Sequence, residues 1–140
     1  MARARGIRIP DELAREVSRE AEARGVSWSA MTTILLAEAL KMRRVPGIVM
    51  VDGPTGRRAV VAGSGLDVWE IIATWHACGR DECQLADNYS WLTQSQLRAA
   101  LAYDQLYPEE IDARLARERQ WTPERVQREL PFAVPRHSAC

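Results

Sequence analysis

The first forty residues contain the elements of a fold that is too small to be stable as one chain. In residues 7–9 the apolar and polar side chains alternate, which predicts a half-buried strand. Two helical patterns follow, one opening at Pro10 and ending at Gly25, the other reaching to the break at Val45-Pro46-Gly47. One strand and two short helices bury little surface, and a single strand has an unpaired edge. We therefore expect an intertwined homodimer, whose apolar contacts include Ile7, Ile9, Leu13, Ile34 and Leu35.

This order of elements resembles the ribbon-helix-helix family of DNA-binding dimers. The family pattern of strand, Pro-x-x-Leu, Gly-x-Ser and Glu-Ala-Leu is present at residues 7–13, 25–27 and 38–40. The resemblance implies that the strands of two chains pair and enter the major groove, with Gly6 and Arg8 facing the bases. It also implies that the start of the second helix binds a phosphate through its backbone N–H groups. The expected DNA-binding residues here are Arg3, Arg5, Gly6, Arg8, Ser27, Trp28 and Ser29. The alternative is that this segment only holds the dimer together.

Charge is balanced over the chain but not along it. The 19 basic and 19 acidic residues cancel, yet residues 1–58 contain eleven basic and seven acidic residues, a net charge of +4. The remainder therefore carries −4. A basic front and an acidic back favour a polyanion at one end and a basic partner at the other. No apolar run approaches membrane length and no signal peptide precedes the strand, so we expect a cytoplasmic protein without a membrane partner.

The sequence gives little support for a metal, a cofactor or an active site. Cys78, Cys83 and Cys140 form no Cys-x-x-Cys pair. His76, His137 and these thiols match no common zinc spacing, so reduced structural thiols are the preferred interpretation. A phosphate-binding glycine loop, a nucleophile elbow and a His-Glu-x-x-His motif are all missing from the sequence. We expect no enzyme activity, metal or cofactor.

Residues 48–107 read as a second small domain. Two apolar runs at 48–51 and 58–61 flank a loop of turn-forming residues, which predicts a hairpin. A helix ending at Gly79 and a shorter one from Asp81 to about Tyr89 follow. Thr93 and Gln96 then form a capping box at the start of a helix that runs to about Leu106. Two helices joined by a tight turn fit a helix-turn-helix with the hairpin as its wing, but an ordinary three-helix core looks similar. In the first interpretation Gln94, Ser95 and Arg98 reach bases or phosphates.

The same region resembles a widespread bacterial domain-of-unknown-function family. The matching residues are Gly63-Ser64-Gly65, Asp67-Val68-Trp69-Glu70-Ile71-Ile72, Gly79, Tyr89, Leu92-Thr93 and Ala99-Ala100-Leu101-Ala102-Tyr103. Members of this family are small winged-helix antitoxins, often encoded beside PIN-like nuclease toxins. The resemblance thus implies a winged-helix domain and a cognate protein toxin.

Residues 108–140 are predicted to be helical and then extended. A helix opens at Pro108, and a second one starts at Thr122-Pro123. The strip Pro131-Phe132-Ala133-Val134-Pro135 is apolar, and its two prolines disfavour a helix. Such a strip is packed on the core, kept for a partner, or disordered; the resemblance to antitoxins favours the partner. The expected partner-binding residues are Ile111, Leu115, Trp121, Val126, Leu130, Phe132 and Val134.

Together these patterns predict a mainly α protein with short β elements. We expect a ribbon-helix-helix dimerisation domain over 1–44, a winged helix-turn-helix domain over 48–107, and C-terminal helices with an extended tail over 108–140. The predicted function is that of an antitoxin in a type II toxin-antitoxin system, which neutralises its toxin and represses its own operator. Two alternatives remain open: a stand-alone transcription regulator, and a dimeric interaction module that does not bind DNA.

Overall fold

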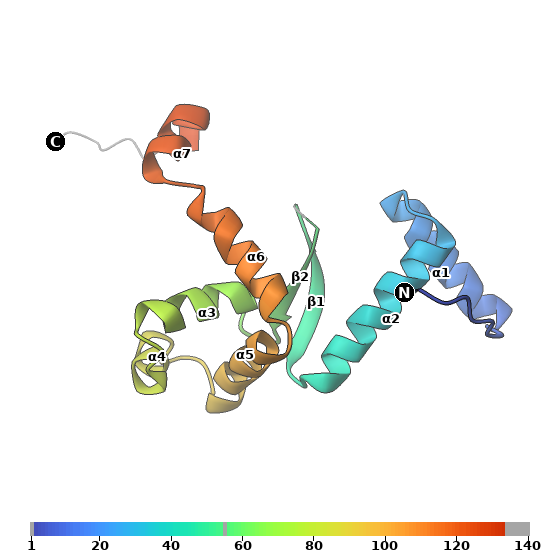
Figure 1. Ribbon diagram of the computed structural model, residues 1–140, viewed down its shortest axis with the longest axis horizontal. Coiled ribbons are helices and arrows are strands. Elements are labelled where there is room, and N and C mark those ends of the chain that lie inside the picture. The colour runs from blue at the N-terminus through green and yellow to red at the C-terminus, as the bar shows by residue number, and fades with distance from the viewer. Residues whose placement is uncertain (1, 55, 134–140) are drawn as a thin grey trace. The chain divides into compact units, whose positions relative to one another are not determined.

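A computed structural model describes residues 2–54 and 56–133 of the chain. The chain divides into two compact units, Met1–Arg44 and Val45–Cys140, which we call unit 1 and unit 2. The described residues form seven α-helices, one two-stranded antiparallel sheet and one 3-10 turn (Figure 1). The mainly α character with short β elements is therefore confirmed.

Unit 1 is a pair of helices, α1 (Asp11–Arg24) and α2 (Trp28–Arg44). Gly25 ends α1 in the left-handed conformation (φ 65°), as the sequence predicted, and its N–H reaches the Ala21 and Glu22 carbonyls. Ser27 begins α2, because its Oγ accepts a hydrogen bond from Ala30 N–H at 3.1 Å. The shared core is small and consists of buried Val17, Ala21 and Met31, with Ile34 and Leu35 packed against them.

The strand predicted for residues 7–9 is not present in the single chain. Residues 2–10 form no helix or strand, and Ile7 is 70% exposed while Ile9 is half-buried. In the described part of the chain this segment pairs with no strand, and an isolated strand leaves its backbone N–H and C=O groups without partners. Since the predicted strand pairs only across a dimer, the pairing of residues 7–9 between two copies stays a prediction.

Unit 2 opens with the predicted hairpin of β1 (Ile48–Gly53) and β2 (Gly56–Val61). The strands pair in a single register from Ile48 opposite Val61 to Gly53 opposite Gly56. Cross-strand neighbours Asp52 and Arg57 form an ion pair at 3.3 Å. The apolar runs thus pair with each other, and the glycine-containing loop closes the hairpin as predicted.

Three helices follow, α3 (Val68–Ala77), α4 (Glu82–Asn88) and α5 (Gln94–Leu106). Each begins at a polar cap. Asp67 precedes α3, and its backbone N–H donates to Glu70 Oε2 at 2.8 Å. Asp81 accepts from the first turn of α4. Thr93 and Gln96 form the predicted reciprocal capping box of α5, with bonds of 2.8 and 3.1 Å.

The main core joins the hairpin to α3, α5 and α6 (Pro108–Arg119). Its most buried side chains are Val45, Val61, Val68, Ile71, Ile72, Leu85, Ala100 and Tyr103. Helix α6 adds Ile111 and Leu115 to the same cluster. Residue 108 therefore marks the start of a helix rather than the edge of the packed unit.

The last described elements are α7 (Pro123–Glu129) and a 3-10 turn, η1 (Pro131–Ala133). Thr122 caps α7 and Pro123 is its first residue, as predicted. The expected extended strip is wrong for residues 131–133. A proline fits the first position of such a turn, since its missing N–H would have no partner there. Val134 and Pro135, part of the same expectation, lie outside the described residues.

Candidate functional site

The residues predicted to contact DNA from unit 1 are accessible. Arg3, Arg5, Gly6 and Arg8 are exposed in the segment before α1. Ser29 is exposed on the first turn of α2, beside Ser27 and its cap. Trp28 is held in place, because its Nε1–H donates to the Ala14 carbonyl of α1 at 3.2 Å. Unit 1 contains nine basic and six acidic residues, a net charge of +3.

The side chains predicted to hold the dimer divide into two groups. Ile34 and Leu35 pack against the small core of unit 1 and are half-buried. Ile7 and Leu13 are exposed, as are two further leucines that the prediction did not include, Leu36 (57%) and Leu40 (53%). The described residues of unit 1 therefore include more exposed than buried large apolar side chains, which is typical of a fold completed by a partner.

The α4–α5 pair has the geometry expected of a helix, a tight turn and a capped second helix. Residues 89–93 connect the two helices, and Gln94, Ser95 and Arg98 are exposed on the first turns of α5. Gln96 extends beyond its capping role, since its Nε2–H donates to the Ala62 carbonyl at the end of β2, at 3.1 Å. This bond fixes the start of α5 to the end of the hairpin.

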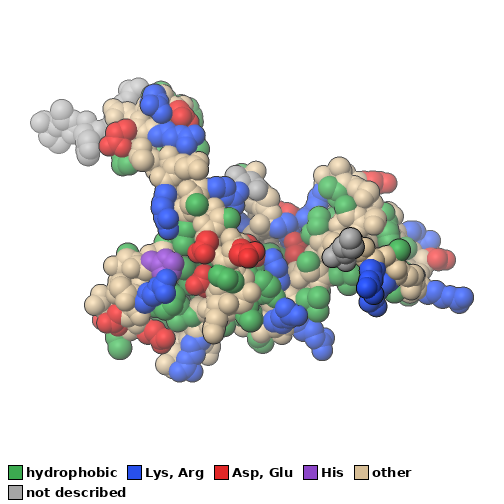
Figure 2. Space-filling view, viewed as in Figure 1, with side chains coloured by type: hydrophobic (Ala, Val, Ile, Leu, Met, Phe, Trp, Pro, Cys, Tyr) green, Lys and Arg blue, Asp and Glu red, His purple; other side chains and the backbone are tan. Residues whose placement is uncertain are grey.

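The helix geometry of unit 2 suits DNA binding, but its charge does not. Because the whole chain is neutral and unit 1 carries +3, the residues of unit 2 sum to −3. On the face shown in Figure 2, acidic and basic side chains are interspersed over unit 2. Glu82 lines the same surface groove as Gln94 and Arg98. A phosphate approaching α5 would therefore meet a carboxylate as well as Arg98.

The predicted partner-binding residues at the C-terminus include two that are buried in the core and others that lie beyond α6. Ile111 and Leu115 are buried in the core of unit 2, so they are not available to a partner; this part of the prediction is corrected. An amphipathic helix must cover its apolar face, and α6 covers its own by packing on α3 and α5. Val134 lies outside the described residues.

The remaining partner-binding candidates lie beyond α6, in what we call the C-terminal arm (residues 120–133). Trp121 is 45% exposed and Phe132 is 84% exposed, while Val126 and Leu130 are half-buried. Helix α7 packs on η1 and lies at the far end of α6, away from α3–α5 (Figure 1).

Arg125 makes several contacts within the C-terminal arm. The Arg125 guanidinium lies 4.6 Å from the centre of the Trp121 ring and bonds Glu129 Oε1 at 3.0 Å and the Gln120 carbonyl at 3.3 Å. The turn before α7 is therefore held by several contacts from one side chain.

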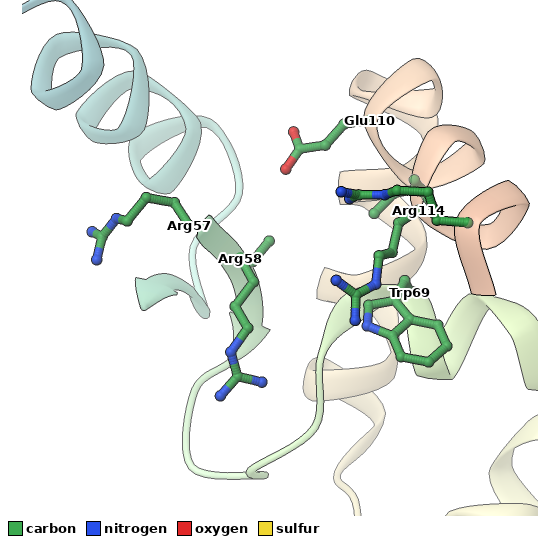
Figure 3. Close-up of a pocket in the computed structure, with 8 residues that line it drawn as sticks. Arg57, Arg58, Trp69, Glu110 and Arg114 are labelled. Atoms are coloured by element: carbon green, nitrogen blue, oxygen red, sulfur yellow. The ribbon is translucent and has the colours of Figure 1, made fainter. Parts of the chain in front are cut away.

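A cluster that the sequence did not predict lies between β2 and α6 (Figure 3). Asp67 is almost fully buried, with 5% of its side chain exposed, and pairs with Arg58 of β2. Its other oxygen accepts from Trp69 Nε1–H at 3.1 Å. The Arg114 guanidinium lies over the Trp69 ring at 5.0 Å and pairs with Glu118 at 2.8 Å. The i,i+4 spacing of Arg114 and Glu118 could have predicted their ion pair. The position of Arg114 next to β2 could not be predicted, because residues 58 and 114 are far apart in the sequence.

A second polar cluster joins α3, α5 and α6. Burial raises the pKa of the Asp104 carboxyl above its usual value of 3.8. The nearby charge of Asp112 acts in the same direction, while His76 and Arg80 act in the opposite one. The Arg80 guanidinium lies 5.4 Å from the centre of the Trp75 ring, and Arg80 itself has a positive φ of 63°.

Two further observations concern residues 2–54 and 56–133 only. In this part of the chain, no His, Cys, Asp and Glu side chains come together in groups of three or more that could hold a metal ion. Helices of the length and apolarity needed to cross a bilayer are likewise missing from it.

One segment of the chain matches a known protein family. Residues 48–104, from the start of β1 to near the end of α5, match the family described as "Protein of unknown function (DUF433)". No curated protein and no solved structure matches the chain. Unit 1 and the C-terminal arm lie outside the matched residues, and the family's description assigns no activity.

Proposed function

We propose that this protein is the antitoxin of a type II toxin-antitoxin system, acting as a homodimer that binds operator DNA and neutralises a cognate protein toxin. The observation that carries the proposal is that large apolar side chains are exposed in two different parts of the chain, and we treat each group as one surface. One is on unit 1, around Leu13, Leu36 and Leu40; the other is on the C-terminal arm, at Trp121 and Phe132. Two such surfaces call for two kinds of partner.

The surface of unit 1 suits a second copy of the chain. Its three-residue buried core is small for a stable fold, and the alternating segment at residues 7–9 pairs with no strand in the described part of the chain. The ribbon-helix-helix resemblance supplies the arrangement, with Arg8 of both copies in one major groove and the start of α2 at a phosphate. The net charge of +3 on unit 1 supports this as the DNA-binding part.

The surface of the arm suits a protein of a different kind. A large aromatic side chain that is 84% exposed contributes almost nothing to the stability of its own chain. Aromatic side chains that become buried on binding carry much of the energy of protein interfaces, and Phe132 and Trp121 could be buried in this way by a partner. The short, pre-ordered α7 and η1 also lose less entropy on binding than a flexible tail would.

For unit 2 we propose a winged-helix architecture that connects these two surfaces. The support is the family match over residues 48–104 and the capped α4–α5 pair bonded to the hairpin through Gln96. A DNA contact by Gln94, Ser95 and Arg98 belongs to the proposal, secondary to unit 1 because of the neighbouring Glu82.

The neutral net charge and the presence of one polar base-reading side chain on the ribbon, Arg8, favour one other function, that of a dimeric interaction module without DNA binding. Gel shifts with the chain's own promoter separate the two. A stand-alone transcription regulator is the remaining alternative, and it would bind that promoter without needing the arm.

The arm is tested by neutralisation of the toxin encoded beside this chain. Phe132→Ala removes the most exposed large apolar side chain of the described residues, and Leu106→Ala, which alters an exposed leucine at the end of α5, is the matched control. We expect Phe132→Ala to weaken toxin binding by about thirtyfold, as for an interface hot spot of about 2 kcal/mol. A chain ending at Gln120 should fold, since it keeps Ile111 and Leu115, but should not neutralise. Equal neutralisation by the shortened and full chains would place the toxin site elsewhere.

A further inference from the structure

A small pocket opens between β2 and α6 of unit 2, lined by residues to which the proposed function assigns no role. Its floor is apolar, made by buried Ala59 and Ile111, and the Trp69 indole forms one wall. The volume is about 60 Å³. One water needs about 10–15 Å³ on the same measure, so the pocket takes a group of a few heavy atoms.

The rim of this β2–α6 pocket is strongly basic. Four arginines and one carboxylate line it: Arg57, Arg58, Arg114, Arg117 and Glu110. The carboxylate is already engaged, because Glu110 Oε2 accepts a hydrogen bond from Tyr103 O–H at 2.8 Å. Figure 3 shows Arg114 lying against Trp69, and Arg57 and Arg58 directed to opposite sides of β2. The side chains that line the pocket from both elements are therefore mostly arginines.

Acidic residues outside the pocket hold two of these guanidinium groups, those of Arg58 and Arg114, in place. Asp67 binds Arg58, and Glu118 binds Arg114 at 2.8 Å; neither carboxylate lines the pocket. A guanidinium has five N–H donors, so an ion pair on one side leaves donors for a second acceptor. Arg58 keeps 43% of its side chain exposed beside its partner, and Arg117 is exposed on the next turn of α6.

We propose that the β2–α6 pocket binds a phosphate group. Arginine forks match the tetrahedral oxygens of phosphate, and ion pairs that fix the side chains beforehand reduce the entropy lost on binding. The phosphate can belong to a DNA backbone or to a small phosphorylated molecule. The assignment is independent of the antitoxin proposal, because it rests only on residues of β2, α6 and the start of α3.

The test is a titration of the full-length protein with inorganic phosphate, followed by the amide and arginine Nε–H signals in NMR spectra. Arg117→Gln is the informative variant, since Arg117 lines the pocket and lies on the exposed side of α6. Arg119→Gln is its matched control, because Arg119 is exposed on the same helix and lines a different groove. We expect saturable shifts at Ala59, Trp69 and Arg114, with phosphate affinity about tenfold weaker in Arg117→Gln and unchanged in Arg119→Gln.

A second arm distinguishes the sources of the phosphate. If the site contacts DNA, Arg117→Gln should lower the dependence of duplex binding on log salt concentration by about one, and Arg119→Gln should not. If phosphate binding depends on Arg117 but duplex binding does not, the ligand is a small phosphorylated molecule. Absence of saturable shifts, equal losses in both variants, or Arg117-dependent binding of an oligoglutamate peptide in place of phosphate would overturn the proposal.

Discussion

Replacing Ile7 by Lys tests whether unit 1 is completed by a second copy of the chain. In the single chain Ile7 is 70% exposed, so Ile7→Lys should change the stability of a monomer by less than about 0.5 kcal/mol. In a paired ribbon each Ile7 would be buried, and burying one such side chain is worth about 1.5–3 kcal/mol.

A symmetric dimer loses this contribution twice, about 3–6 kcal/mol in all, before any cost of burying the Lys charge. Because every 1.4 kcal/mol is a factor of ten, the dimer Kd should rise by about 10² to 10⁴. Sedimentation equilibrium of both proteins over a range of concentrations measures this change. Leu106→Lys, which alters an exposed leucine on unit 2, is the control and should leave the Kd unchanged. A wild-type monomer at micromolar concentration, or an Ile7→Lys protein that dimerises normally, would refute the reasoning.

Three further predictions follow from named contacts. Arg8→Ala should lower the preference for the chain's own promoter over random DNA by about 1–3 kcal/mol in gel shifts. If the wild-type protein binds promoter and random DNA equally well, and Arg8→Ala changes neither affinity, Arg8 does not read bases. Asp67→Ala should lower the free energy of unfolding by about 2 kcal/mol in urea titrations, since it removes the capping side chain of α3 and the acceptor of Trp69 Nε1–H. An unchanged midpoint would contradict this. The raised pKa of Asp104 means that the folded state disfavours its charged form, so stability falls as the pH rises from below 3.8 through the higher folded-state pKa. Asp104→Asn should therefore be more stable relative to wild type at pH 7 than at pH 3, and a stability difference independent of pH would rule this out.

Features set by neighbouring residues were predictable from the sequence. The helix starts at Asp81, Thr93 and Thr122, and the end at Gly25, depend on side chains and backbone within a few residues. The pairing of the hairpin follows in the same way from two apolar runs and a short glycine-containing loop.

Features set by distant partners were not predictable. The apolar stripe of α6 suits a partner or the chain's own core equally well, and only the packed structure places Ile111 and Leu115 inside. The same is true of the cluster at Asp67, which pairs with Arg58 and bonds Trp69, whose ring lies under Arg114. Residues 7–9 illustrate the other limit, because a strand that needs a second chain cannot form in one.

The most direct test of the antitoxin proposal is co-expression of this chain with the product of the adjacent gene. We predict that the adjacent protein alone arrests growth of the host cells, that the full chain restores growth, and that the two proteins purify as one stable complex. An adjacent product that does not impair growth, or a toxicity that the full chain leaves unchanged without forming a complex, would contradict the account.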